Sequence, residues 1–181
     1  MKRLFPILIC ISILLGCQGN EGMDEALALR SAMLKAKTCD FSIQITADYG
    51  DMVYSFSMDC VADDLGNVGF TVTKPETIAG ITGNLTADGG NLTFDDTVLA
   101  IPMLTDDQIT PVSAPWILMQ TLRGGYITSC DKGRVTIDDS YADDALKLDI
   151  TLDQNQMPKF AEIYWKNRRI LTVEVVSFVL S

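Results

Sequence analysis

The sequence predicts an α+β domain, in which one helix precedes a long antiparallel meander of short strands and a second, shorter helix is inserted. Three observations carry this prediction. Apolar residues recur with a helical period between Met23 and Lys37. From Phe41 onward the period drops to two, in short segments bounded by turn residues. The stretch from Ser113 to Leu122 returns to a helical period.

The N-terminus has the pattern of a bacterial lipoprotein signal. Lys2 and Arg3 precede the apolar run Leu4–Leu15, which is about half as long as a bilayer span requires. The run ends in Leu-Leu-Gly-Cys, which resembles the lipobox, where a cysteine is diacylated and the chain is cut just before it. We therefore expect residues 1–16 to be a signal peptide and the mature chain to begin at a lipidated Cys17. An ordinary secretory signal with a chance cysteine is the alternative.

The composition is acidic and lacks histidine. The formal net charge is −10, and it becomes −12 when Lys2 and Arg3 leave with the signal peptide. This charge argues against nucleic acid as a partner and against electrostatic binding to anionic lipid, so the acyl anchor would provide the membrane link. Without histidine the commonest general base and metal ligand is missing. We expect a non-enzymatic protein without a cofactor, on the extracytoplasmic face of the cell membrane.

After a lipidated tether at residues 17–22, we expect one domain at residues 23–181 that opens with an amphipathic helix, Met23–Lys37. Its apolar face is Ala26, Leu29, Met33 and Ala36, widened by Met23, Leu27 and Leu34. The polar face is not rich in lysine or arginine, as that of a membrane-surface helix would be. Packing on a sheet is therefore favoured over lying on the membrane.

Alternation in Phe41–Ala47 and Met52–Met58 predicts a hairpin that turns at Asp48–Asp51. The shortest loop consistent with this pattern has two residues, Tyr49 and Gly50. That register sets two aspartates, Asp40 and Asp59, directly opposite each other, which is unfavourable. A loop two residues longer is the alternative.

The two-residue loop would also place Cys39 opposite Cys60. These residues would form a non-hydrogen-bonded pair with Cα atoms about 4.5 Å apart, close enough for a disulfide. Extracytoplasmic proteins can retain disulfides, so we expect this bond and an unpaired Cys130. Three free thiols are the other outcome.

Further short strands and the inserted helix follow along the chain. The strands are expected near Val68–Val72, Ile78–Thr86, Leu92–Phe94, Val98–Ile101, Tyr126–Cys130, Val135–Ile137, Leu146–Leu152, Lys159–Trp165 and Arg169–Leu180. Gly80 and Gly83 suggest a bulge or bend. Ser113 can cap the inserted helix, which carries Pro115 in its first turn and which Gly124-Gly125 ends. The last strand is apolar on both faces, so we expect both to be covered.

Acidic pairs and one cysteine are the remaining candidates for chemistry. The pairs are Asp63-Asp64, Asp95-Asp96, Asp106-Asp107, Asp138-Asp139 and Asp143-Asp144. Calcium binds carboxylate oxygens, but none of these pairs has the spacing of a calcium loop, so solvated turns are favoured. Cys130 has no obvious base to activate it as a nucleophile. We therefore expect no catalytic residue and no metal site.

The order of elements resembles the lipoprotein-carrier superfamily of LolA and LolB, through most of residues 23–180. The segments that most resemble this family are Pro158–Tyr164 and Arg169–Val175, which look like the family's closing hairpin. The resemblance implies a strongly curved open antiparallel sheet, a half-barrel of about 10–11 strands covered by the N-terminal helix and the short inserted helix. The anchor at Cys17 looks more like LolB. The chain is also similar to the GerS-like lipid-anchored proteins of spore-forming Gram-positive bacteria, which implies a protein partner.

Two functions are expected from this resemblance. The first is a lipid-anchored extracytoplasmic binding protein that holds an apolar ligand, lipid or lipoprotein in the concave cavity. Its ligand contacts would be Tyr54, Phe56, Phe70, Trp116 and Met119, which could equally be core residues. The second is a non-enzymatic scaffold that binds and supports an envelope or spore-cortex enzyme through protein contact.

Overall fold

The computed structural model describes residues 21–102, 104–105, 108–140, 142 and 145–181. The expected signal peptide (residues 1–16) and Cys17 lie outside the described residues. In chain order the elements are α2 (Glu21–Lys35), β1 (Thr38–Asp48), β2 (Val53–Asp63), β3 (Val68–Lys74), β4 (Thr82–Thr86), β5 (Gly89–Phe94), β6 (Thr97–Ile101), β7 (Leu104–Thr105), β8 (Gln108–Ile109), the 3-10 turn Pro111–Ser113, α3 (Ala114–Gly124), β9 (Tyr126–Asp131), β10 (Arg134–Asp138), β11 (Lys147–Leu152), β12 (Pro158–Trp165) and β13 (Arg168–Leu180).

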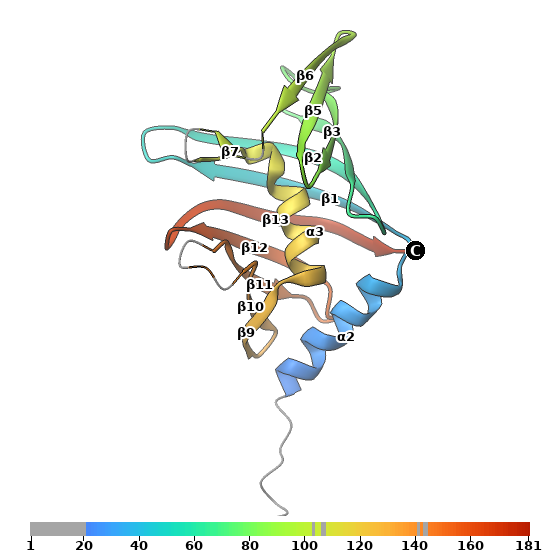
Figure 1. The fold of residues 1–181 in the computed structure, drawn as a ribbon, viewed down its shortest axis with the longest axis vertical. Helices are drawn as coiled ribbons and strands as arrows, with labels where there is room; N and C mark the ends of the chain where they lie inside the picture. The colour runs from blue at the N-terminus through green and yellow to red at the C-terminus, as the bar shows by residue number, and fades with distance from the viewer. Residues whose placement is uncertain (1–20, 103, 106–107, 141, 143–144) are drawn as a thin grey trace, which may run out of the picture.

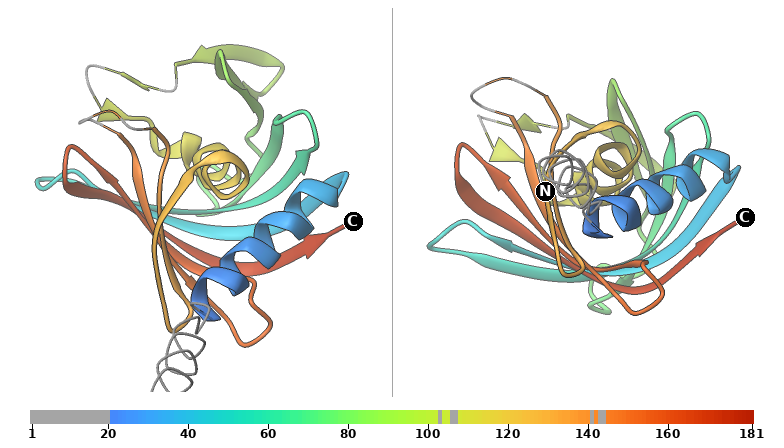
Figure 2. Two further views of the ribbon diagram at one scale, coloured as in Figure 1. Left: turned by 60° about the horizontal axis from the view of Figure 1, so that its bottom comes forward. Right: turned by 90° about the horizontal axis from the view of Figure 1, so that it is seen from below.

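One strongly curved antiparallel sheet forms most of the fold (Figure 1). It has 11 strands in the order β6-β5-β4-β3-β2-β1-β13-β12-β11-β10-β9, so the last strand of the chain pairs with the first. The sheet is not closed, because β6 and β9 are its two edges. Figure 2 shows both helices on the concave side of this sheet. The expected half-barrel of the α+β class is confirmed.

The register between β1 and β2 is the alternative with the longer loop. Asp48 pairs with Val53, so residues 49–52 form a four-residue loop and the predicted two-residue loop is wrong. Asp48 Oδ1 accepts a hydrogen bond from the Gly50 N–H at 2.8 Å, and Gly50 has a φ of 89°, which glycine adopts easily. The longer loop sets Asp59 opposite Ser42, whose hydroxyl donates to Asp59 Oδ1 at 2.7 Å. A hydrogen bond thus replaces the like-charge pair.

α2 begins two residues earlier than expected, so Glu21 and Gly22 belong to the helix and not to the tether. Its buried stripe is also narrower than expected. Leu27 and Leu34 are 48% and 63% exposed, because they lie about a quarter turn or more from the buried stripe of the helix. Among the described residues, no helix is long and apolar enough to cross a membrane.

Three smaller expectations differ from the structure. The strand expected at Ile78 begins only at Thr82, after a turn in which Gly80 has a φ of 90°. Ser113 occupies the cap position of α3, but its hydroxyl donates to the Thr110 carbonyl at 2.6 Å instead of capping the helix. The end of β13 is not covered on both faces. Val176 is 72% exposed, because both helices lie on the concave side of the sheet.

Candidate apolar ligand site

The concave face of the sheet is lined by apolar side chains that the helices cover. The inward residues of β1 are Cys39, Phe41, Ile43, Ile45 and Ala47, and each is buried. Leu148 and Ile150 of β11 and Val173 of β13 are fully buried as well. The two-residue period of a strand brings these side chains to one face. The concave face of the sheet is therefore an apolar surface that α2 and α3 cover.

α3 is fixed above this surface by hydrogen bonds to the β2–β3 turn. Trp116 Nε1 and Gln120 Nε2 both donate to the carbonyl oxygen of Gly66, each at 3.0 Å. Arg123 donates to the carbonyl oxygen of Asp63. Gly66 has a φ of +92°, which favours glycine, and a Cβ there would lie 2.6 Å from Gln120 Nε2, so a larger residue would displace that side chain. Polar contacts therefore anchor α3 in addition to its apolar packing.

α2 is held mainly by apolar contacts. Ala26, Leu29 and Met33 are buried against the rest of the fold. Among the described residues, one side-chain hydrogen bond ties α2 to its surroundings: Arg30 Nε donates to the Leu122 carbonyl of α3 at 2.9 Å. Arg30 Nη2 is buried and has no hydrogen-bond partner among the described residues, and burial lowers the pKa of this guanidinium. Among the described residues, Arg123 Nη2 of α3 is also buried without a hydrogen-bond partner, so each helix carries one incompletely paired guanidinium.

The two ends of α2 are attached differently. At its C-terminal end the chain joins the sheet, where the backbone N–H groups of Lys37 and Thr38 donate to the Ser181 carbonyl at 2.7 and 3.0 Å. At its N-terminal end Gly22 lies against the edge strand β9, where a Cβ would be 3.3 Å from the Cβ of Cys130. The N-terminal end of α2 therefore packs against β9, whereas its C-terminal end is joined to the sheet by backbone hydrogen bonds.

A small apolar cavity lies beneath α2. Its lining is Ala26, Leu29, Arg30, Leu122, Ile127, Val135, Ile137, Ile150 and Leu152. Its volume is about 10 Å³. Pockets for small molecules usually hold about 300–1,000 Å³, so this cavity admits no acyl chain while α2 is in place. The helices fill the concavity of this structure.

A larger hollow, of about 730 Å³, lies between the β11–β12 turn and the last part of β13. Met157, Val176 and Phe178 line it together with the polar or charged Asp153 and Lys159. The mixed lining suits an acyl chain less well than the apolar lining beneath α2.

The five predicted ligand contacts do not come together around one pocket, and of the five only Phe70 lines another hollow, of about 470 Å³, in the part of the chain that the structure describes. Phe56, Phe70 and Met119 are buried, and Trp116 is half-buried. Tyr54 is 46% exposed. None of the five lines the cavity beneath α2. As contacts to a ligand they stay predictions.

Sequence reasoning missed the residues that do line this cavity, among them Arg30 and Leu122. The signal that could have found Arg30 is its position within the apolar stripe of the helix, next to Leu29. A charged residue at such a position is buried at the helix contact and needs a carbonyl partner.

The cysteines in the described residues are buried and free. Cys39 pairs with Ala62 and Cys60 pairs with Phe41, so the two thiols do not face each other and the predicted disulfide is not formed in this structure. Burial raises the pKa of Cys39 to about 12, and burial also raises the pKa of Cys60 and of Cys130. Thiols with raised pKa values are weak nucleophiles at neutral pH.

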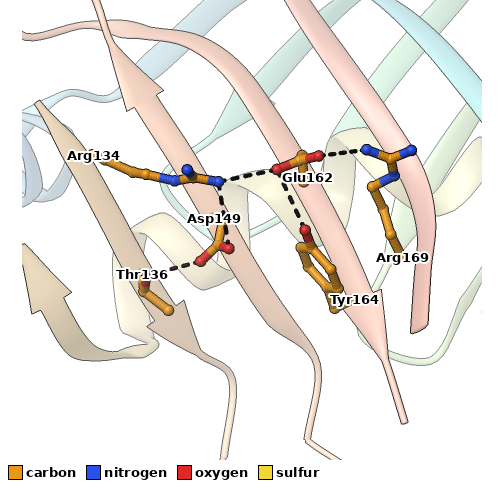
Figure 3. A network of polar contacts seen from close by, with 6 residues as sticks. All are labelled: Arg134, Thr136, Asp149, Glu162, Tyr164 and Arg169. Atoms are coloured by element: carbon orange, nitrogen blue, oxygen red, sulfur yellow. Dashed lines mark hydrogen bonds and ion pairs between the residues drawn. The ribbon is translucent and has the colours of Figure 1, made fainter. Parts of the chain in front are cut away.

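Two carboxylates face each other on the other side of the sheet, Asp149 of β11 and Glu162 of β12 (Figure 3). Arg134 lies between them, 3.7 Å from Asp149 Oδ2 and 3.1 Å from Glu162 Oε2. Arg169 binds Glu162 Oε1 at 2.7 Å. The two arginines offset the repulsion between the carboxylates.

Neutral side chains complete this network. The Thr136 hydroxyl donates to Asp149 Oδ1 at 2.8 Å, and the Tyr164 hydroxyl donates to Glu162 Oε2 at 3.4 Å. Burial, and then the charge of Glu162, raises the pKa of Tyr164. Both carboxylates are therefore engaged with partners of their own. In the part of the chain that the structure describes, no group of three or more histidine, cysteine, aspartate or glutamate residues could hold a metal ion.

No protein-family model matches the sequence, and a search of the curated proteins finds no match. Among solved structures the chain is similar to an uncharacterized conserved protein from Thermus thermophilus, at 12% identity over 88% of this chain and 87% of that one, with a TM-score of 0.48. It is similar to a LolA superfamily protein from Nitrosomonas europaea, at 9% identity over 86% and 93% of the two chains, with a TM-score of 0.46. It is also similar to the lipoprotein LppX from Mycobacterium tuberculosis, at 11% identity over 88% and 96%, with a TM-score of 0.41. The curved open sheet with helices on its concave side is the architecture that the sequence resemblance implied.

Proposed function

We propose that this protein is a lipid-anchored extracytoplasmic binding protein that takes an apolar ligand between α2 and the concave face of the sheet. One observation carries the proposal. An almost closed apolar cavity lies beneath a helix that one side-chain hydrogen bond holds, whereas the neighbouring helix is anchored by several. When α2 pivots away, Leu29 and Met33 leave an apolar surface that an acyl chain can cover in their place.

The expected anchor supports this choice of ligand. Three residues lie between Cys17 and Glu21, so the start of α2 is four Cα-to-Cα steps, at most roughly 14 Å, from a lipidated Cys17. The mouth of the cavity would then open near the membrane surface, where acyl chains are available. Cys17→Ala should move the protein from the membrane fraction to the soluble fraction or leave it unprocessed. A variant that is processed normally and stays membrane-bound would contradict the anchor.

A second candidate function is the scaffold that binds an envelope enzyme through protein contact. The observation that favours it is the filled concavity, since a cavity of about 10 Å³ offers no site to a ligand unless a helix moves. A scaffold would use the outer surface of the sheet and would not require α2 to open.

Lipid binding by the purified protein distinguishes the two candidates. Lipids extracted after gentle purification are identified by mass spectrometry, and cis-parinaric acid is titrated into the delipidated protein. Trp165→Phe leaves Trp116 as the single tryptophan, so its emission reports on the environment of α3. If the protein binds an apolar ligand, binding should saturate near one ligand per protein and the emission of Trp116 should change. A folded protein that binds no fatty acid or phospholipid supports the scaffold instead.

A further inference from the structure

β6 is an edge strand of the sheet and lies at the opposite end of the fold from α2 (Figure 1). Among the described strands, β6 pairs with β5 alone. Its residues Val98 and Leu99 are 66% and 61% exposed. Because successive residues of a strand point to opposite faces, β6 exposes an apolar side chain on each of its two faces.

The backbone of β6 presents unpaired groups at this edge. Asp95 and Asp96 have φ values of 48° and 59°, which define a two-residue turn between β5 and β6. The pair next to such a turn is hydrogen-bonded, and bonded pairs then alternate, so Thr97, Leu99 and Ile101 bond to β5. The N–H and C=O groups of Val98 and Ala100 therefore point outward, and no described residue forms a backbone hydrogen bond to them.

The devices that usually protect an exposed edge are missing from β6 itself. Edge strands commonly carry a charged residue, a proline or a bulge that prevents pairing with another chain. Thr97–Ile101 contains no charged residue and no proline, and its pairing with β5 has no register shift. The edge can accept another strand over this length.

Both ends of the β6 edge are acidic. Asp95 and Asp96 lie at its start. Asp88 lies near its end, because the adjacent Gly89 packs against the Ile101 carbonyl, 3.1 Å from where a Cβ would stand. No lysine or arginine occurs between Lys74 and Arg123, so nothing along this part of the chain offsets the negative charge.

We propose that the β6 edge binds an extended segment of a protein partner by strand addition, and that this segment has apolar residues at alternate positions and basic residues at its ends. Backbone hydrogen bonds to Val98 and Ala100 would supply the pairing, and Val98 and Leu99 would contact the apolar residues. The basic ends would meet Asp88 and the Asp95–Asp96 turn. A second copy of this chain fits less well. In an antiparallel pair of β6 edges, the Asp95–Asp96 turn of each copy would lie beside Asp88 of the other, and these like charges repel.

The test uses the full mature protein and a synthetic peptide with a core of alternating valine and threonine and two lysines at each end. Amide hydrogen exchange is followed residue by residue by NMR. The peptide should slow exchange at Val98 and Ala100 by on the order of tenfold or more at saturation, while Thr97 and Leu99, already bonded to β5, should change little. The same core with glutamates at its ends should give no protection.

Two variants separate pairing from charge. Ala100→Pro removes an outward N–H that β5 does not use, so the fold should persist by circular dichroism and the protection at Val98 should disappear. Replacing Asp95 and Asp96 by asparagine should reduce the preference for the lysine peptide. Replacing the exposed Asp51 and Asp64 by asparagine makes the same change in net charge elsewhere and should leave the preference intact.

Several results would overturn the proposal. The proposal is wrong if the peptide does not slow exchange at Val98 and Ala100, if the two peptides protect these amides equally, or if protection persists in Ala100→Pro. Protection that rises with protein concentration in the absence of peptide, together with a dimer in sedimentation, would make the occupant a second copy and also contradict the proposal. None of these outcomes depends on whether α2 opens.

Discussion

A cysteine at position 22 should lock α2 onto the edge of the sheet. The Cβ position at Gly22 is 3.3 Å from the Cβ of Cys130. Disulfides join Cβ atoms about 3.5–4.5 Å apart, so a shift of a few tenths of an ångström in α2 allows Gly22→Cys to bond to the native Cys130. The three heavy atoms nearest to the Cβ position at Gly22 all belong to Cys130, so Cys39 and Cys60 should not compete for the new thiol.

The size of the effect follows from the chain between the two thiols. The bond would close a loop on the order of a hundred residues, for which the chain-entropy model gives up to about 4.7 kcal/mol of stabilisation, less any strain from the close approach. Urea unfolding of the oxidised variant, compared with the same sample in reductant, measures this difference. Gly22→Ser has a side chain of similar size and no thiol, so reductant should not change its stability. If an oxidant forms no bond between positions 22 and 130, the placement of α2 against β9 is wrong.

The remaining predictions concern stability. Met33→Ala removes a fully buried side chain of α2 and should lower the free energy of unfolding by about 2–5 kcal/mol. Leu27→Ala, on the exposed side of the same helix, should change the free energy of unfolding by less than about 0.5 kcal/mol. Asp96→Gly should raise the free energy of unfolding by about 0.5–1 kcal/mol, because glycine adopts the φ of 59° without strain. A free energy that is unchanged or lower in urea unfolding would contradict this. The pKa of Cys39 is raised from 9.0 to about 12, so the folded state favours the neutral thiol. The part of the free energy of unfolding that comes from this pKa shift is fully present below pH 9 and falls by about 1.4 kcal/mol per pH unit above it. The free energy of unfolding of Cys39→Ala, measured across the same pH range, should not show this fall.

Patterns within single segments were sufficient to predict most of the fold. The alternation in Leu146–Leu152 corresponds to β11, and the helical period of Ser113–Leu122 corresponds to α3. The family resemblance supplied the curvature, which no single segment encodes. The β1–β2 register was missed because two loop lengths fit the same alternation. The Ser42–Asp59 hydrogen bond belongs to the longer loop.

The site was harder to predict than the fold, for a physical reason. Phe56, Phe70 and Met119 would have the same apolar character whether they lined a pocket or filled a core. The sequence also does not reveal that α3 is anchored through Gly66 or that Arg30 of α2 bonds to Leu122 of α3, since both contacts use backbone carbonyls distant in the chain. The difference in how the two helices are held therefore required the structure.

We propose that α2 moves to admit an apolar ligand, and the uptake of cis-parinaric acid by Gly22→Cys shows whether it does. The bond to Cys130 would fix the N-terminal end of α2, while its C-terminal end is already tied to the sheet through Ser181. We expect the oxidised variant to take up little ligand, reductant to restore uptake to the level of the wild-type protein, and Gly22→Ser to bind equally with and without reductant. Equal uptake by the oxidised and reduced variant, or no uptake by any of these proteins, would contradict the account.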